Sequence, residues 1–172
     1  IEAKDNNHSV GDGMQQALDY AETLDVPFVF SSNGDEFLFH DRTGQSEELE
    51  TIIALEKFPT PDLLWSKYRV WKGLTPEQDP VVLQPYHDDG SGKEPRYYQR
   101  NAINAAVEAI AKGQNRILLV MATGTGKTML AAFDYKAFSD ENKVNDAHKS
   151  PSLLFIAHRG EILKQSLIII LI

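Results

Sequence analysis

One eight-residue segment restricts the fold of this chain more than any other. It reads M-A-T-G-T-G-K-T over residues 121–128, and its first residue, Met121, ends the apolar run R-I-L-L-V-M. A G-x-x-x-x-G-K-[ST] loop between a buried strand and a helix binds phosphates through its backbone N–H groups. The segment matches this pattern except at its first position, where Met121 replaces glycine. It therefore predicts a phosphate-binding loop in an α/β fold with a parallel sheet.

The residues of this loop predict distinct contacts with a nucleotide. Lys127 is expected to reach the β- and γ-phosphates, and the Thr128 hydroxyl is expected to bind Mg²⁺. The start of the following helix adds a partial positive charge. ATP and Mg²⁺ are therefore the expected cofactors. The backbone that wraps the phosphates is expected to come from four residues: Thr123, Gly124, Thr125 and Gly126.

The surrounding sequence predicts a β–α–β unit. We expect a helix over 96–112 that Gly113 ends, a buried strand over 116–121, and a helix over 127–138. A polar loop over 139–151 then leads to a second buried strand over 152–157, and a helix begins near Gly160. The apolar positions of the first helix predict its buried face: Tyr98, Ala102, Ala105, Ala106, Ala109 and Ile110.

The first half of the chain predicts a different arrangement. A strand end over 1–4 and a loop over 5–11 precede a helix that Asp12 caps and that runs to Leu24. Strands are expected over 26–31 and 36–40, joined by a turn at Asn33-Gly34. Short helices over 47–57 and 62–72 and a linker over 75–94 follow. The apolar stripe of the first helix is Met14, Ala17, Leu18 and Ala21.

Charge is divided unequally along the chain. Residues 1–95 hold 7 Lys/Arg against 19 Asp/Glu, whereas residues 96–172 hold 10 against 6, although the whole chain carries −8. This step predicts two units, of which the second is better suited to a polyanion. No cysteine is present, and no apolar run approaches the ~20 residues of a membrane span. A reducing cytoplasm and no membrane partner are therefore expected.

Residues on either side of the loop predict contacts with adenine and with nucleic acid. Gln99 precedes Lys127 by 28 positions, in a segment Y-Y-Q-R that resembles the adenine-reading Q motif of superfamily-two helicases. Its amide has a donor and an acceptor, so it can pair with adenine, and a surface glutamine is the competing interpretation. Arg96 is expected to flank the base. His158 and Arg159 follow the predicted strand 152–157, at the strand end where open α/β sheets place their sites, and are expected to contact DNA phosphates.

The N-terminal residues predict a second, metal-dependent site. Strand alternation places Glu2 and Lys4 on one face, so that Glu2 can help to hold Mg²⁺ and Lys4 can orient the attacking water. Gln16 and Tyr20 lie one helical turn apart and share one flank of the next helix. An exposed ion pair and an ordinary helix flank are the competing interpretations, because each motif alone is weak.

Taken in order, these motifs resemble a known family. I-E-A-K at 1–4, G-x-x-Q-A-x-x-Y-A at 13–21 and P-F-V-F-S-S-N-G at 27–34 resemble the nuclease domain of type I restriction endonuclease R (HsdR) subunits. That domain has the PD-(D/E)xK nuclease fold. Y-Y-Q-R at 97–100, A-T-G-T-G-K-T at 122–128 and L-L-F-I-A-H-R at 153–159 resemble the Q motif, motif I and motif Ia of superfamily-two helicases and translocases.

The resemblance implies an organisation and an activity. Residues 1–45 are expected to end a PD-(D/E)xK nuclease domain, 46–95 to form a helical linker, and 96–172 to begin a RecA-like motor domain. The implied activity is ATP-dependent translocation of double-stranded DNA coupled to Mg²⁺-dependent cleavage. The implied partners are the methylation and specificity subunits of the complex.

The family pattern is also incomplete in this sequence. It requires an acidic residue on the strand before E-x-K, a D-E-x-H-like motif and a second RecA-like lobe, none of which this sequence contains. We therefore expect a segment of a longer polypeptide that is inactive alone. Two alternatives stay open: a stand-alone helicase or repair ATPase with a degenerate nuclease domain, and an inert DNA-binding remnant.

Overall fold

The computed structural model describes residues 1–86, 94–128, 130–131, 154, 156, 160–161 and 164. These residues belong to two compact units, Ile1–Pro76 and Glu77–Ile172. The mixed α/β character predicted from the sequence is confirmed, and no helix within the described ranges is long and apolar enough to cross a membrane. Several predicted features lie outside the described residues: the loop 139–151, most of the strand 152–157, His158 and Arg159.

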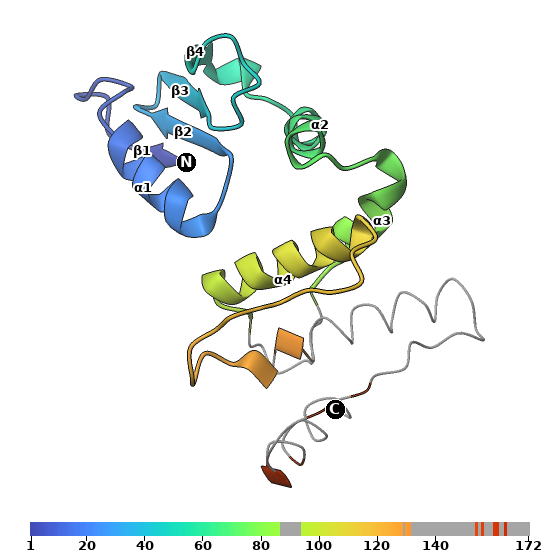
Figure 1. The fold of residues 1–172 in the computed structure, drawn as a ribbon. Helices are drawn as coiled ribbons and strands as arrows, with labels where there is room; N and C mark the ends of the chain where they lie inside the picture. Colours follow the sequence, from blue (N-terminus) through green and yellow to red (C-terminus); the bar gives the residue numbers. More distant parts are fainter. Residues whose placement is uncertain are drawn as a thin grey trace. The chain divides into compact units, whose positions relative to one another are not determined.

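The first unit is built on a four-stranded sheet with the order β1-β2-β3-β4 (Figure 1). Strand β1 pairs in parallel with β2, and the other neighbours are antiparallel. The Asn33-Gly34 hairpin is confirmed, because Gly34 adopts a φ of 97° between β2 and β3. The strand bounds are Glu2–Ala3 for β1, Phe28–Ser32 for β2, Glu36–Asp41 for β3 and Glu50–Ala54 for β4.

Helix α1, Met14–Leu24, covers one face of this sheet. The predicted apolar stripe is confirmed: Met14, Ala17 and Ala21 are buried against Val29 of β2, with Leu18 and Leu38 packed around them. The predicted cap is wrong, because Gly13 occupies the N-cap position. The Asp12 carboxylate instead accepts a hydrogen bond from the Ser9 N–H at 3.1 Å, and so it orders the loop before the helix.

Aromatic side chains cover the opposite face of the sheet. Successive strand residues point to opposite faces, so the phenylalanines that alternate with Val29 and Leu38 gather on the side away from α1. The buried Phe30 ring stacks on Phe39 at 4.8 Å, and Phe58 closes the cluster at 4.7 Å from Phe30 and 4.8 Å from Phe37. The first unit therefore has two apolar layers separated by one sheet.

The prediction of a helix over 47–57 is wrong. Residues Glu50–Ala54 form strand β4, paired with β3, and Leu55–Lys57 form a single 3₁₀ turn, η1. The β-branched run T-I-I pairs directly with the aromatic strand β3, and cross-strand packing outweighs the helix preference of the flanking glutamates. The prediction of a helix over 62–72 is confirmed by α2, Pro61–Lys72.

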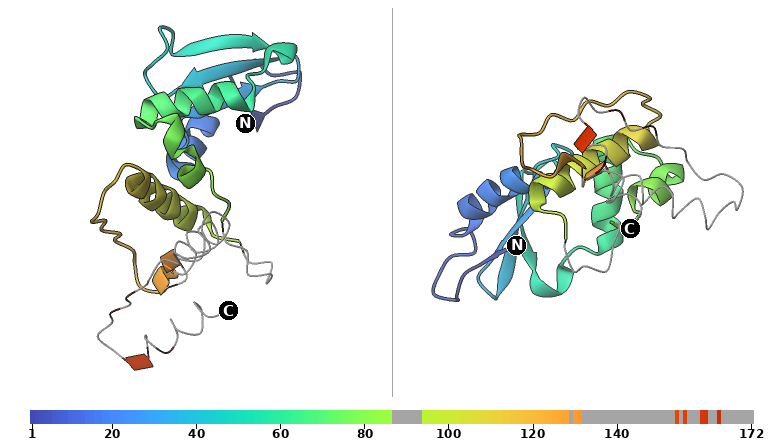
Figure 2. Two further views of the ribbon diagram at one scale, coloured as in Figure 1. Left: turned by 90° about the vertical axis from the view of Figure 1, so that its right-hand side faces the viewer. Right: turned by 90° about the horizontal axis from the view of Figure 1, so that it is seen from below.

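Helix α2 has clear start and stop signals. The Thr60 hydroxyl accepts a hydrogen bond from the Leu63 N–H at 3.3 Å, Pro61 fills the first turn, and Gly73 ends the helix with a φ of 64°. Figure 2 shows α2 beside the sheet, to which Lys67 binds through Asp41. The helix predicted to belong to a linker is therefore part of the same compact unit as the sheet.

The described part of the second unit centres on helix α4, Tyr97–Ala111, which Gly113 follows at a φ of 75°. The short turn η2, Pro76–Gln78, and helix α3, Asp79–Val82, precede it within the predicted linker. Val81 packs against Ile103 and Val107. The buried face is displaced from the predicted one, because Ile103, Ala106 and Val107 are buried whereas Ala105 and Ile110 are exposed.

The predicted strand over 116–121 is absent from the structure. Residues 116–120 have no regular secondary structure and are drawn as a coil in Figures 1 and 2. Leu118 and Val120 are 86% and 85% exposed, whereas Ile117 and Leu119 are about half as exposed, at 40% and 37%. The alternation suits a strand, but a strand forms only when neighbours satisfy its backbone groups. The described residues provide no such neighbour.

Candidate functional site

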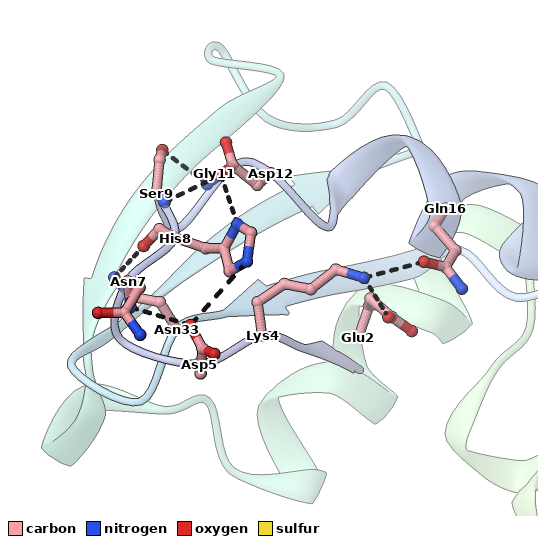
Figure 3. Close-up of polar contacts among 10 residues, drawn as sticks. All are labelled: Glu2, Lys4, Asp5, Asn7, His8, Ser9, Gly11, Asp12, Gln16 and Asn33. Carbon is pink, nitrogen blue, oxygen red and sulfur yellow. Dashed lines mark hydrogen bonds and ion pairs between the residues drawn. The ribbon is translucent and has the colours of Figure 1, made fainter.

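Four predicted residues of the first unit form one continuous chain of hydrogen bonds. The Lys4 Nζ lies 3.1 Å from the Glu2 Oε1 and donates to the Gln16 Oε1 at 3.1 Å (Figure 3). The Gln16 amide in turn donates to the Tyr20 hydroxyl at 2.8 Å. Strand β1 and helix α1 therefore bring Glu2, Lys4, Gln16 and Tyr20 together, and we call these four residues the E-K-Q-Y row.

The backbone explains why these side chains meet. Strand β1 runs parallel to β2 with Glu2 opposite Ser31, and the Lys4 N–H continues the pairing by donating to the Ser32 carbonyl at 2.8 Å. Glu2 and Lys4 consequently share the face that α1 covers. Gly13 permits this approach, because a Cβ at this position would lie 2.7 Å from the Ser31 Oγ and 3.0 Å from the Glu2 Cγ.

A polar loop borders the row on one side. The His8 ring lies between two carboxylates, with its Nδ1 3.2 Å from Asp12 and its Nε2 3.9 Å from Asp5 (Figure 3). Asn33 donates to the His8 carbonyl at 3.2 Å and so ties the loop to the β2–β3 turn. Asp5 faces His8 and the Asn7 N–H, so it does not supply a second carboxylate beside Glu2.

The E-K-Q-Y row fits part of a magnesium site. Mg²⁺ is bound through one or two carboxylates together with water and phosphate oxygens. Glu2 supplies one carboxylate, and its hydrogen bond to Lys4 uses only Oε1. No group of three or more metal-ligating side chains occurs among the residues that the structure describes. These residues therefore provide one metal ligand and one cation, and the remaining ligands would be water, phosphate oxygens or a further carboxylate.

A second network was not predicted from the sequence. Asp41, at the end of β3, is 1% exposed and accepts hydrogen bonds from the Thr43 N–H and hydroxyl, the Ser46 hydroxyl and the Lys67 ammonium group at 2.5–3.2 Å. Burial alone would raise the pKa of Asp41, but these hydrogen bonds outweigh it and lower the pKa to about 2. The partners are 2 to 26 residues away, so no periodic pattern reveals the network.

The loop that carries this network also reaches α1. Arg42, next to Asp41, donates from one guanidinium nitrogen to the Ala21 carbonyl at 2.9 Å and to the Val26 carbonyl at 2.7 Å. The first of these acceptors lies in the last turn of α1, where helix carbonyls need external partners. One short loop therefore fixes the end of α1 and, through Lys67, the helix α2.

In the second unit, the glycine-rich segment forms a compact loop. Gly124 and Gly126 adopt φ values of 82° and 85°, which side chains other than glycine rarely adopt. The Thr125 hydroxyl donates to the Ala122 carbonyl at 2.7 Å. Lys127 and Thr128 begin a helix directly after the loop, as the sequence predicts. These residues therefore have the loop-to-helix geometry that binds phosphate groups.

Lys127 and Gln99 both contact this loop. The Lys127 ammonium donates to the carbonyls of Met121 and Ala122 at 2.9 and 2.8 Å. The Gln99 amide donates to the Thr125 carbonyl at 3.0 Å, and its oxygen accepts from the Arg96 N–H at 2.9 Å. An amide can make a further bond at each end, so these contacts leave Gln99 able to pair with a base.

Apolar packing holds the loop against helix α4. Met121, the residue that departs from the usual glycine, packs with Ile103, Val107 and Leu130 in one buried cluster. A side chain at this position therefore has a structural purpose that glycine cannot serve. The Arg96 guanidinium lies 3.3 Å from the Tyr98 hydroxyl, at the same end of α4 as Gln99. The predicted nucleotide-contacting residues that the structure describes thus gather at one end of α4.

Comparisons with known proteins identify subunits of restriction enzymes as the relatives of this chain. Residues 92–168 match the family model "Type III restriction enzyme, res subunit". The chain is 52% identical over 167 residues to the type I restriction enzyme EcoAI endonuclease subunit of Escherichia coli, a match that covers 96% of this chain and 20% of that protein. It is 64% identical over 108 residues to the EcoKI endonuclease subunit of E. coli K12, covering 62% of this chain and 9% of that protein.

A solved structure gives the same result. The chain resembles a fragment structure assigned to the HsdR subunit of a type I restriction enzyme from Vibrio vulnificus YJ016, with a TM-score of 0.68 and 42% identity. The match covers 80% of this chain and 25% of that one. The chain thus spans about a fifth of the length of the EcoAI subunit and a quarter of the solved fragment.

Proposed function

This chain is homologous to one segment of the endonuclease subunit, HsdR, of type I restriction enzymes, and from this premise we propose that it contributes to both activities of such a subunit. The whole protein hydrolyses ATP to translocate double-stranded DNA and cleaves that DNA with Mg²⁺. It acts in the cytoplasm together with methylation and specificity subunits. The match of the motor segment to a restriction-enzyme family favours this function over a stand-alone repair helicase.

We propose that residues 1–76, the compact unit to which strand β4 and helix α2 also belong, are part of a PD-(D/E)xK nuclease domain, that 77–95 form a connecting segment and that 96–172 belong to a RecA-like motor domain. The observation that carries the nuclease assignment is the E-K-Q-Y row, whose four members come from two elements and are joined by hydrogen bonds. Glu2 holds the metal ion, and Lys4 orients the attacking water. Bound Mg²⁺ supplies positive charge that stabilises the phosphate during cleavage.

Gln16 and Tyr20 extend this site along helix α1. The Gln16 oxygen fixes the Lys4 ammonium, and the Tyr20 hydroxyl fixes the Gln16 amide. A lysine that is held at both Glu2 and Gln16 presents its charge in one place, which is what positioning an attacking water requires. We expect DNA cleavage to depend on all four residues, with the largest losses at Glu2 and Lys4.

For the motor, we propose that ATP binds at the loop 123–128. Lys127, which here donates to the Met121 and Ala122 carbonyls, would donate instead to the β- and γ-phosphates, and the Thr128 hydroxyl would help to hold the accompanying Mg²⁺. Gln99 and Arg96 contact the adenine. His158 and Arg159 contact the DNA backbone. Each role rests on the motif, and for the described residues also on their position around the loop.

Cleavage by the full-length protein tests the nuclease assignment. Lys4→Ala is expected to lower DNA cleavage by about two orders of magnitude or more, because it removes the ammonium group that orients the attacking water. Lys57→Ala changes the charge equally at an exposed position outside the row and serves as the control. Cleavage that survives in Lys4→Ala at the parent rate would exclude the row as the nuclease site.

A further inference from the structure

The hydroxyl of Ser31 is an unusual feature of the first unit. Ser31 lies in β2 with 0% exposure, and its Oγ has no hydrogen-bond partner among the described residues. Folded proteins rarely leave a buried hydroxyl unsatisfied, because the group loses its bonds to water without replacement. The neighbouring Ser32 shows the usual outcome: its hydroxyl donates to the Glu36 carbonyl at 2.9 Å and accepts from the Gly34 N–H at 3.2 Å.

The Ser31 hydroxyl, which lacks a hydrogen-bond partner, lies beside the proposed cleavage site. In the parallel pairing of β1 and β2 it lies opposite Glu2, and the two side chains share the face that α1 covers. A Cβ on Gly13 would meet both residues, the Ser31 Oγ at 2.7 Å and the Glu2 Cγ at 3.0 Å. The Gly13 backbone therefore lies close to both the Ser31 hydroxyl and the Glu2 side chain, and a larger residue at this position would displace one of them.

We propose that Ser31 is a positioning residue of the nuclease site: its hydroxyl, which has no partner in this structure, would donate to the Glu2 oxygen that Lys4 does not use when Glu2 turns to bind a metal ion. This bond would fix the carboxylate from the sheet side while Lys4 fixes it from the other, and so would orient Glu2 toward Mg²⁺. The inference rests on the proposed role of Glu2 as a metal ligand. Hydrogen bonds that orient a metal-binding carboxylate commonly change metal affinity by about 10- to 100-fold.

The competing interpretation is a buried hydroxyl without a role. The two interpretations differ in measurable ways. A hydroxyl without a role only lowers the stability of the folded protein, because it is removed from water without gaining a partner. Its removal would therefore leave metal binding unchanged. A hydroxyl that orients Glu2 makes metal affinity fall when it is removed, while the free protein without metal loses no stability.

Metal binding to the full-length protein, without nucleotide or DNA, tests the proposal. The probe is Mn²⁺, which carboxylate and water sites accept in place of Mg²⁺ and which electron paramagnetic resonance detects. Ser31→Ala is expected to weaken Mn²⁺ binding about 10- to 100-fold, with a Tm equal to or above that of the parent. Ser32→Ala, the matched control, is expected to lower the Tm and to leave Mn²⁺ affinity unchanged.

Two further variants separate the possible failures. Glu2→Ala is expected to abolish the Mn²⁺ site, and Gly13→Ala is expected to weaken it by displacing the Ser31 hydroxyl. Full Mn²⁺ affinity in Ser31→Ala, with binding lost in Glu2→Ala, would overturn the role of Ser31 and leave the nuclease site standing. Full Mn²⁺ affinity in Glu2→Ala would overturn the proposed nuclease site itself, and the role of Ser31 with it.

Discussion

Replacing Asp41 by asparagine perturbs the most deeply buried charge of the first unit. The Asp41 carboxylate accepts hydrogen bonds from Thr43, Ser46 and Lys67, and the last of these joins helix α2 to the sheet. Asparagine has nearly the same shape but carries no charge, and its NH₂ group meets donors where the second carboxylate oxygen was. The substitution therefore weakens the attachment of α2 without opening a cavity.

The expected loss of stability follows from the pKa of Asp41, which falls from 3.8 to about 2 on folding. Each pKa unit corresponds to about 1.4 kcal/mol, so the ionised carboxylate contributes about 2 kcal/mol to the free energy of unfolding. Because the folded pKa is the lower one, this contribution is complete above about pH 5 and is lost as the pH falls toward 2. Asp41→Asn is therefore expected to cost about 2 kcal/mol at neutral pH and progressively less in acid.

Urea unfolding followed by tryptophan fluorescence measures the change in the free energy of unfolding and reports on helix α2. Trp65 and Trp71 are the two tryptophans of the chain, and both lie in α2. Glu47→Gln makes the same change of charge at an exposed carboxylate and serves as the control. If Asp41→Asn unfolds with the same midpoint as the parent at pH 7, or if the difference between them does not shrink below pH 4, the reasoning about the buried network is refuted.

Three other substitutions test separate parts of the structure. Gln99→Ala removes the contact with Thr125 for any nucleotide, and the proposed contact with the base for ATP alone. ATP affinity should therefore fall by about 1–3 kcal/mol more than GTP affinity, and equal losses in a competition assay would exclude adenine recognition. Phe30→Ala removes the centre of the aromatic cluster and should cost about 3–5 kcal/mol in urea unfolding, and a cost below 1 kcal/mol would show that the cluster is not a core. Arg159→Ala should weaken DNA binding equally for all sequences. The plot of the logarithm of the DNA-binding constant against the logarithm of the salt concentration should become less steep by about one unit, and an unchanged slope would exclude a phosphate contact.

Local sequence signals predicted those parts of the structure that depend on neighbours in the chain. The turn at Asn33-Gly34 and the positive φ values of Gly124 and Gly126 follow from glycine itself. Helix α2 is expected over 62–72 and is found over Pro61–Lys72, where Thr60 and Gly73 provide the local start and stop signals. The two spacings E-x-K and Q-x-x-x-Y fixed which side chains share a face, and the structure joins both pairs into one row.

Features that depend on distant partners were predicted wrongly or missed. Residues 47–57 contain glutamates that favour a helix, but pairing with β3 decides their structure. The run 116–121 has the composition of a buried strand, yet composition provides no neighbour for its backbone groups. Asp41 and Lys67 are 26 positions apart, and Ser31 is distinguished only by the hydrogen bond it lacks. None of these features leaves a periodic signal in the sequence.

The division of labour between the two units is tested most directly by measuring DNA cleavage and DNA-stimulated ATPase on the same preparations of two full-length variants. Glu2→Ala is expected to abolish cleavage and to keep the parent rate of ATP hydrolysis, because it removes the proposed metal ligand of the nuclease site and leaves the proposed ATP site unchanged. Lys127→Ala is expected to abolish ATP hydrolysis, because the phosphates lose the charge that binds them. A folded Glu2→Ala protein that still cleaves DNA, or that loses ATPase together with cleavage, would contradict the account.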